Sequence, residues 1–180
     1  MSISRASIVA ACAVVCGCAS EGGSAPPTRT TTFGEPAPSE MTAAWDISIP
    51  PSGAGLPKGG GTARQGERVY EQKCQACHGA KGAGKPADPL VGGIGTLASK
   101  VPLRTVGSYW PYATTLFDYV RRAMPMTNPL SLTDEEVYAV SAYVLYLNGI
   151  ISEDDEISAR TLPLVRMPNR DGFVNAWQPR

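Results

Sequence analysis

Cys74, Cys77 and His78 stand in the order Cys-x-x-Cys-His, in a chain of 180 residues that contains one histidine. On a helical turn, two thiols three residues apart project from the same side. They can add to the two vinyl groups along one edge of a haem, and the histidine that follows is then placed under the iron as its proximal ligand. This spacing is typical of covalent c-type haem attachment. The sequence therefore predicts one covalently bound haem c, held by Cys74, Cys77 and His78.

Other kinds of site use the same residue types. A thioredoxin-like redox pair needs a βαβ context, which the sequence lacks. A structural zinc site needs four ligands, and here thiols and imidazole supply only Cys74, Cys77 and His78. A disulfide between the two cysteines remains the alternative if no haem is inserted. The single histidine excludes bis-histidine haem, a distal-histidine peroxidase and a zinc enzyme with a two-histidine motif.

With the histidine used, a methionine thioether is the expected second axial ligand. Met1 and Met41 fall in a leader and a linker, which leaves Met124, Met126 and Met167. Met124 precedes a proline and a strongly capped helix. The residues between His78 and Met124 therefore provide one loop and one short helix to surround the haem edge. Met124 is the predicted distal ligand, and Met126 is the alternative. A soft sulfur ligand opposite imidazole raises the reduction potential and closes the iron to other ligands, which favours electron transfer over catalysis at the iron.

The first seventeen residues have the pattern of a secretion signal. Arg5 precedes an apolar run that is too short to span a bilayer, which takes roughly 20 apolar residues. The run ends in Val15-Cys16-Gly17-Cys18, which resembles the bacterial lipobox. Residues 1–17 are therefore predicted to be a lipoprotein-type signal peptide and Cys18 the lipidated residue, with cleavage by the ordinary signal peptidase as the alternative. The chain is expected to be exported and lipid-anchored to a bacterial membrane on its periplasmic side.

A tether is expected to follow the anchor. Of the 43 residues from 19 to 61, 15 are Gly or Pro, a share above the roughly 25–30% that indicates disorder. Residues 18–61 are therefore predicted to be a flexible tether, although apolar residues such as Trp45, Ile47 and Leu56 allow its second half to pack on the domain.

Residues 62–150 carry the pattern of an all-α haem domain. Thr62–Gln65 can form a capping box at the start of a first helix. A short amphipathic helix is expected at 114–123. The last helix begins with a second capping box, Thr133–Glu136, continues with apolar residues at steps of three and four, and ends at Asn148-Gly149. No stretch alternates as strands do, so we expect little or no sheet.

The numbers of basic and acidic residues are balanced. Lys and Arg equal Asp and Glu at 16 each, so no basic surface for nucleic acid is expected.

Residues 151–180 form a tail that is too apolar for a plain disordered end. It is expected either to pack on the domain or to serve as a partner-docking arm.

Gly66, Tyr70 and the Cys-x-x-Cys-His motif, together with Tyr143, resemble a class I c-type cytochrome over residues 62–148. The resemblance implies three to five short helices wrapped around one covalent haem. It also implies that Gly66 lets the last helix cross the first one closely, with Tyr143 as the aromatic partner.

The same resemblance assigns roles in the loops. The family has a proline whose carbonyl accepts the Nδ1–H of the proximal histidine, and Pro89 matches that proline. Met124-Pro125 matches the family's axial methionine motif. Three residues are candidates for contacts with the haem edge or a propionate, or alternatively for ordinary core packing: Arg104, Tyr109 and Trp110.

A narrower resemblance lies outside the haem motif. Trp45–Ile47 with Gly55–Pro57, Thr105–Thr114 and Val165–Phe173 resemble the cytochrome subunits of bacterial sulfite and sulfane dehydrogenases. In those complexes the haem subunit takes electrons from a subunit that carries a molybdenum cofactor and oxidises the sulfur compound. The resemblance therefore implies a molybdenum-cofactor dehydrogenase subunit as partner, with a downstream cytochrome or oxidase.

Three functional hypotheses follow. The first is a monohaem electron carrier that serves as redox subunit or acceptor of a molybdenum-dependent dehydrogenase, not a catalyst by itself. The second is a membrane-tethered cytochrome that relays electrons to a terminal oxidase without a dedicated dehydrogenase. The third is a haem protein with a labile sixth site that senses small ligands.

Overall fold

The computed structural model describes residues 34–174, 176 and 177. The chain divides into two compact units, Met1–Pro38 and Ser39–Arg180, and the second unit holds all the elements named below. The predicted signal peptide and Cys18 lie outside the described residues. Within the described ranges, no helix is both long and apolar enough to cross a membrane.

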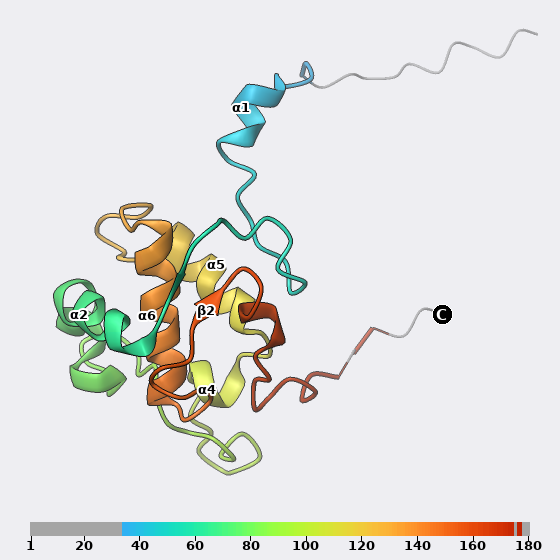
Figure 1. Cartoon of the computed structure of the whole chain (residues 1–180). Coiled ribbons are helices and arrows are strands. Elements are labelled where there is room, and N and C mark those ends of the chain that lie inside the picture. The colour runs from blue at the N-terminus through green and yellow to red at the C-terminus, as the bar shows by residue number, and fades with distance from the viewer. Residues whose placement is uncertain (1–33, 175, 178–180) are drawn as a thin grey trace, which may run out of the picture. The chain divides into compact units, whose positions relative to one another are not determined.

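The second unit is helical, which confirms the all-α prediction (Figure 1). Between residues 62 and 150, a range described without gaps, it has five α-helices, at the upper end of the expected number. Two two-residue strands pair antiparallel, with Gly60 opposite Ser158 and Gly61 opposite Ile157. The elements in chain order are α1 (Ser39–Ala43), β1 (Gly60–Gly61), α2 (Ala63–Lys73), α3 (Gln75–His78), η1 (Ala80–Gly82), α4 (Val106–Tyr109), α5 (Ala113–Ala123), α6 (Asp134–Leu147), β2 (Ile157–Ser158) and η2 (Leu162–Leu164).

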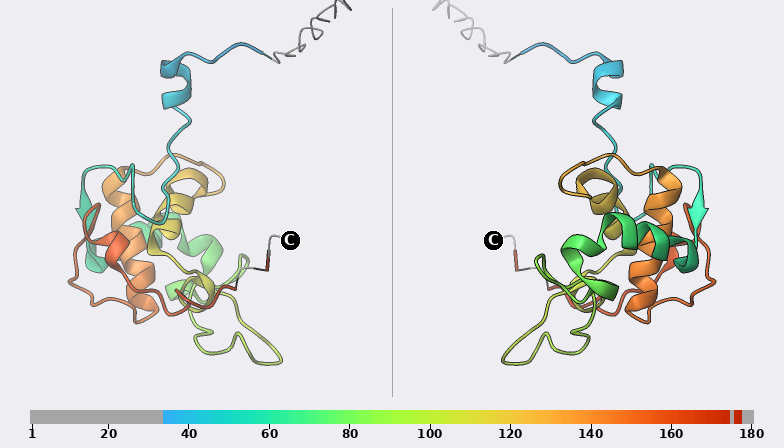
Figure 2. Two further views of the ribbon diagram at one scale, coloured as in Figure 1. Left: turned by 90° about the vertical axis from the view of Figure 1, so that its right-hand side faces the viewer. Right: turned by 90° about the vertical axis from the view of Figure 1, so that its left-hand side faces the viewer.

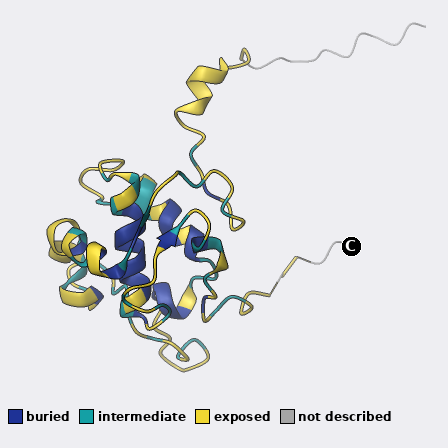
Figure 3. Ribbon diagram, viewed as in Figure 1, coloured by how far each residue is buried: buried dark blue, intermediate teal, exposed yellow. Residues whose placement is uncertain are grey.

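The helix α6 forms the centre of the core. Nine consecutive residues, Val137 to Leu145, are buried along it, and Figure 3 shows buried segments of the neighbouring helices facing it. Both capping boxes form as predicted, with Thr62 and Gln65 at the start of α2 and Thr133 and Glu136 at the start of α6. Because Gly149 has a φ of 68°, it ends α6 in a left-handed conformation that glycine adopts without strain.

The helices α2 and α6 cross in direct backbone contact. A Cβ at residue 66 would overlap the carbonyl oxygen of Ala139 and lie 2.9 Å from the Cβ of Tyr143. The rings of Tyr70 and Tyr143 pack across the same crossing, with centroids 5.3 Å apart. The close approach predicted at Gly66 is therefore present, and it requires glycine because no side chain fits between the two backbones.

The segment 47–57, which we call the N-terminal strap, is bound to the domain. The amide of Ile49, a buried residue, donates to Asp118 Oδ1 at 2.8 Å. The hydroxyl of Tyr138 donates to the Pro57 carbonyl at 2.8 Å. By contrast, Trp45 is 82% exposed just before the strap. The second half of the segment predicted as a tether thus packs on α5 and α6 from residue 47 onward.

The tail after α6 also packs on the domain. Its apolar residues Ile157, Leu162 and Met167 are buried in the core, whereas Phe173 and Val174 are exposed. Figure 2 shows the tail running along the helical unit, while residues 92–104 extend from it as a loop. The buried Met167 fills core space, so its role is structural.

Asp118 on α5 anchors the strap, and this anchor predicts a pH dependence of stability. Burial alone would raise the pKa of Asp118, but hydrogen bonds from Arg122 and from the Ile49 amide outweigh it and lower the pKa below its usual value. Since the folded pKa lies below the unfolded one, the stabilisation is fully present above the unfolded pKa, about 3.9. It is lost as the pH falls through the folded pKa.

We expect Asp118→Asn to lower the free energy of unfolding at pH 7 by about 1–2 kcal/mol, because a charged hydrogen-bond pair with Arg122 is lost. Denaturant unfolding of the haem-loaded protein at pH 7 and at steps below pH 4 measures this. The difference between wild type and variant should shrink as the pH falls. A difference that stays constant down to pH 2 would mean that Asp118 is not the titrating anchor.

Candidate haem-binding site

Cys74, Cys77 and His78 lie on one tight turn. The helix α2 ends at Lys73, and Cys74 leaves helical geometry with φ −121° and ψ −36°. Its carbonyl then accepts the amides of Cys77 and His78 at 3.1 and 3.0 Å. Cys74 thus stands between α2 and α3, and Cys77 and His78 lie on α3, immediately after the helix that packs on α6.

Both cysteines of the motif are free thiols, so the alternative of a Cys74–Cys77 disulfide is not formed. Cys74 is half-buried and Cys77 is exposed. Burial, with a smaller contribution from Cys77, raises the pKa of Cys74 to about 11. Before haem attachment, Cys74 is therefore expected to be a neutral thiol at neutral pH.

The imidazole of His78 is oriented by one backbone carbonyl. Its Nδ1 lies 3.0 Å from the carbonyl oxygen of Asp88. Because that oxygen can only accept, Nδ1 carries the proton, and Nε2 is left with a free lone pair. The prediction that Pro89 supplies this carbonyl is wrong by one residue. The amide of Ala87, the residue before Asp88, donates to the Cys77 carbonyl at 2.9 Å and so ties this segment to the haem-binding turn.

The loop after His78 is tied back to α2 and α3. The hydroxyl of Tyr70, a fully buried residue, donates to the Gly79 carbonyl at 2.8 Å. The amide of Gly84 donates to the His78 carbonyl at 2.7 Å, and that of Leu90 to the Gly82 carbonyl at 2.9 Å. Apart from the Tyr70 hydroxyl, the groups that hold this loop are backbone groups.

Met124 is the residue at which α5 ends. It is half-buried, its amide donates to the Val120 carbonyl at 3.1 Å, and its backbone is extended. Met126, the alternative ligand, is 76% exposed. The helix α5, which ends at Met124, packs on α6, as does α2, which precedes the turn of His78. Burial favours Met124, and ligation of iron by Met124 stays a prediction.

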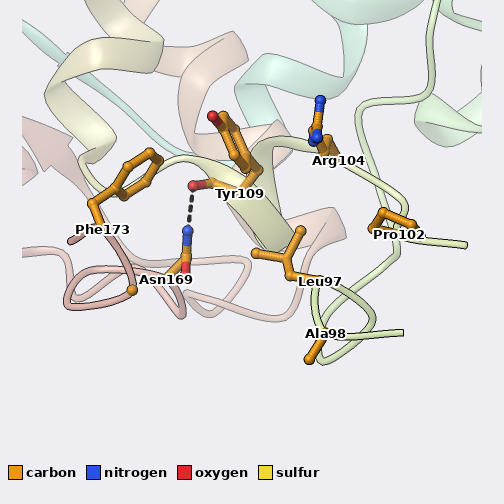
Figure 4. Close-up of a pocket in the computed structure, with 8 residues that line it drawn as sticks. Leu97, Ala98, Pro102, Arg104, Tyr109, Asn169 and Phe173 are labelled. Carbon is orange, nitrogen blue, oxygen red and sulfur yellow. Dashed lines mark hydrogen bonds between the residues drawn. The ribbon is translucent and has the colours of Figure 1, made fainter. Parts of the chain in front are cut away.

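Arg104 and Tyr109 line an open pocket of about 350 Å³ between the loop 92–104 and the tail (Figure 4). The Arg104 guanidinium lies 5.6 Å from the centre of the Tyr109 ring, and Asn169 donates to the Tyr109 carbonyl at 2.8 Å. Phe173 contacts the same ring edge-on, with centroids 5.2 Å apart. Tyr109 is 37% exposed, so core packing does not describe it, and contact with a haem propionate remains the prediction for this pair.

Trp110 differs from its neighbour. It is half-buried and packs edge-on against Tyr119, with ring centroids 5.8 Å apart. Its position thus agrees more with the packing alternative. Tyr109 is the last residue of α4 and Trp110 follows it; this one-turn helix was not predicted from the sequence. Thr105 and Ser108 cap it with a third capping box, in which Ser108 stands where the usual sequence signature has Glu or Gln.

The donor set fits haem c. Two free thiols and an imidazole share one turn, and the imidazole has one nitrogen bonded to a carbonyl and the other available for iron. The thioether of Met124, at the end of α5, would be a soft second ligand.

Comparisons with known proteins agree with this geometry. Residues 61–144 match the family described as cytochrome C oxidase, cbb3-type, subunit III. Among solved structures, a chain of the sulfane dehydrogenase SoxCD from Paracoccus pantotrophus is 36% identical in sequence. The match covers 80% of the present chain and 71% of the other, with a TM-score of 0.75. No curated protein sequence gives a significant match.

Proposed function

Since this chain belongs to the family of class I c-type cytochromes and binds haem c covalently, we propose that it transfers electrons for a molybdenum-dependent dehydrogenase of sulfite or another sulfur compound, as redox subunit or acceptor. Electron transfer as such follows from the family. The finer assignment is supported by one observation, the 36% identity to a chain of the sulfane dehydrogenase SoxCD over 80% of this chain.

Four residues of the chain would hold the haem. Cys74 and Cys77 would carry the porphyrin through thioether bonds, His78 would bind the iron through Nε2, and Met124 would bind it from the other side. The bound haem supplies a reversible one-electron change of its iron. The Asp88 carbonyl holds the Nδ1 proton of His78, which fixes the ring and raises its basicity as an iron ligand.

The N-terminal region would hold the cytochrome at a membrane. We infer export to the periplasmic side of a bacterial membrane, with a lipid on Cys18 and residues 18–46 as tether. The described residues 34–46 support this arrangement, because each of them is exposed to solvent. The bound strap begins only at Ile47.

The test uses the full-length protein purified gently from its own membranes. Sulfite, and separately thiosulfate, is added without oxygen while the visible spectrum is recorded, with dithionite as the control for total reducible haem. We expect fast haem reduction by one of the two sulfur compounds, in a fraction that also contains a molybdenum protein. Reduction by dithionite alone would contradict the proposed donor.

A second candidate is a tethered cytochrome that passes electrons to a terminal oxidase without its own dehydrogenase. The match of residues 61–144 to an oxidase-subunit family favours it. Under this alternative, the purified cytochrome would support oxygen uptake by membranes that contain a terminal oxidase. It would remain oxidised with both sulfur compounds.

A further inference from the structure

Asn148, at the end of α6, uses its whole side-chain amide. Only 8% of the residue is exposed. Its Nδ2 donates to the carbonyls of Val144, at 2.9 Å, and Leu90, at 3.1 Å. Its Oδ1 accepts from the amide of Gly92 at 3.3 Å. A cap of α6 needs only the Val144 bond, so the two other bonds tie the helix end to a distant loop.

A second side chain holds the same loop from α4. The hydroxyl of Thr105 donates to the carbonyl of Gly92 at 2.6 Å. Both polar backbone groups of Gly92 are thus occupied, one by Asn148 and one by Thr105. The two elements can meet here because residue 107 is glycine, where a Cβ would overlap the Asn148 side chain. We call Asn148 and Thr105 the loop clamp.

The loop clamp holds the segment that carries the acceptor of His78. The carbonyl of Asp88, which accepts from His78 Nδ1, lies two residues before Leu90. On its other side, the Ala87 amide is bonded to the Cys77 carbonyl. The segment that carries the Asp88 carbonyl is therefore held on both sides. On one side the Cys77 carbonyl binds the Ala87 amide, and on the other the loop clamp binds Leu90 and Gly92.

We propose that Asn148, together with Thr105, is a positioning residue that keeps the Asp88 carbonyl on His78 and so sets the reduction potential of the haem. The inference rests on the proposed function, since it takes His78 as the iron ligand. A carbonyl that binds the Nδ1 proton makes imidazole a stronger donor. A stronger imidazole donor stabilises ferric iron and so lowers the reduction potential. Loss of the loop clamp would weaken that donor and therefore raise the reduction potential.

The experiment measures the midpoint potential, the visible spectrum and the thermal midpoint of the haem-loaded protein. Asn148→Leu removes all three hydrogen bonds at similar volume. We expect the midpoint potential to rise by up to about 59 mV, which equals a tenfold change in the one-electron equilibrium. Exchange of the His78 Nδ1 proton and of the Gly92 amide, followed by NMR in the ferrous protein, is expected to become faster.

A second pair of variants decides the matter if Asn148→Leu does not fold. Thr105→Val removes the other half of the clamp and is expected to raise the potential, whereas Thr105→Ser keeps the hydroxyl and restores it. Val137→Ala is the matched control. It removes buried volume from the same helix, so it should lower the thermal midpoint and leave the potential unchanged.

The two proposals fail in different ways. A wild-type spectrum without six-coordinate low-spin haem would contradict the axial ligands of the proposed function. If that spectrum is present in wild type and variants, but the clamp variants lose only thermal stability and keep the wild-type potential and exchange rates, Asn148 is a helix cap and the inference is wrong.

Discussion

Met124→Ala is expected to convert the haem from six-coordinate low-spin to a form with an open or water-bound sixth site. The soft thioether stabilises ferrous iron, so its loss should lower the reduction potential. Axial ligands set haem potentials over about 0.8 V, and we expect a fall of about 59 mV or more, a tenfold change in the equilibrium. Visible spectroscopy and a redox titration of the purified protein measure both effects.

Met126→Ala is the matched control, because the side chain two residues on is 76% exposed. It should leave the spectrum and the potential unchanged. The reduced Met124→Ala protein should bind carbon monoxide rapidly, whereas the wild type should resist it. Rapid binding by the wild type would instead favour the ligand-sensing hypothesis. A spectral change in Met126→Ala alone would move the assignment to Met126.

Gly66→Ala is expected to give the largest loss of stability. The new methyl group would overlap the Ala139 carbonyl, which is backbone, so the two helices must separate. Overpacking of this kind costs typically 1–3 kcal/mol or more, partly offset by about 1 kcal/mol of helix propensity. Because the overlap is with backbone, we take the upper end of this range and expect a net loss of about 2 kcal/mol. At roughly 2–4 °C per kcal/mol, the thermal midpoint should fall by about 4–8 °C.

The control for Gly66→Ala is Gln72→Ala on the same helix. The Gln72 side chain is exposed, so its removal should change the free energy of unfolding by no more than about 0.5 kcal/mol. Calorimetry of the two haem-loaded variants beside wild type measures the contrast. Equal thermal midpoints for the two variants would show that the helices can separate at no cost.

Local signals explain what the sequence could predict. The capping boxes at Thr62 and Thr133 formed because each needs only residues three apart. The close crossing at Gly66 joins it to the distant Ala139 and Tyr143, and it was predictable only from the family resemblance. The motif turn of Cys74 to His78 follows from five consecutive residues.

The features that escaped prediction depend on distant partners. The acceptor of His78 is the carbonyl of Asp88 and not that of Pro89, in a loop whose Ala87 amide is bonded to the Cys77 carbonyl. Asn148 was interpreted only as the end of a helix, although two of its bonds reach residues 90 and 92. The anchoring of Ile49 on Asp118 joins residues 69 positions apart. Single-sequence patterns carry no signal for such pairs.

The crossing of α2 and α6 has a consequence for the order of events during biosynthesis. The partner surface for the helix before Cys74 is made by Ala139 and Tyr143, near the other end of the domain. A chain synthesised from its N-terminus therefore presents the cysteines and His78 well before that surface exists, and closing so long a loop is slow. We therefore expect the motif to stay accessible for haem attachment during that interval, and the docking of α6 on α2 to be the step that completes the domain.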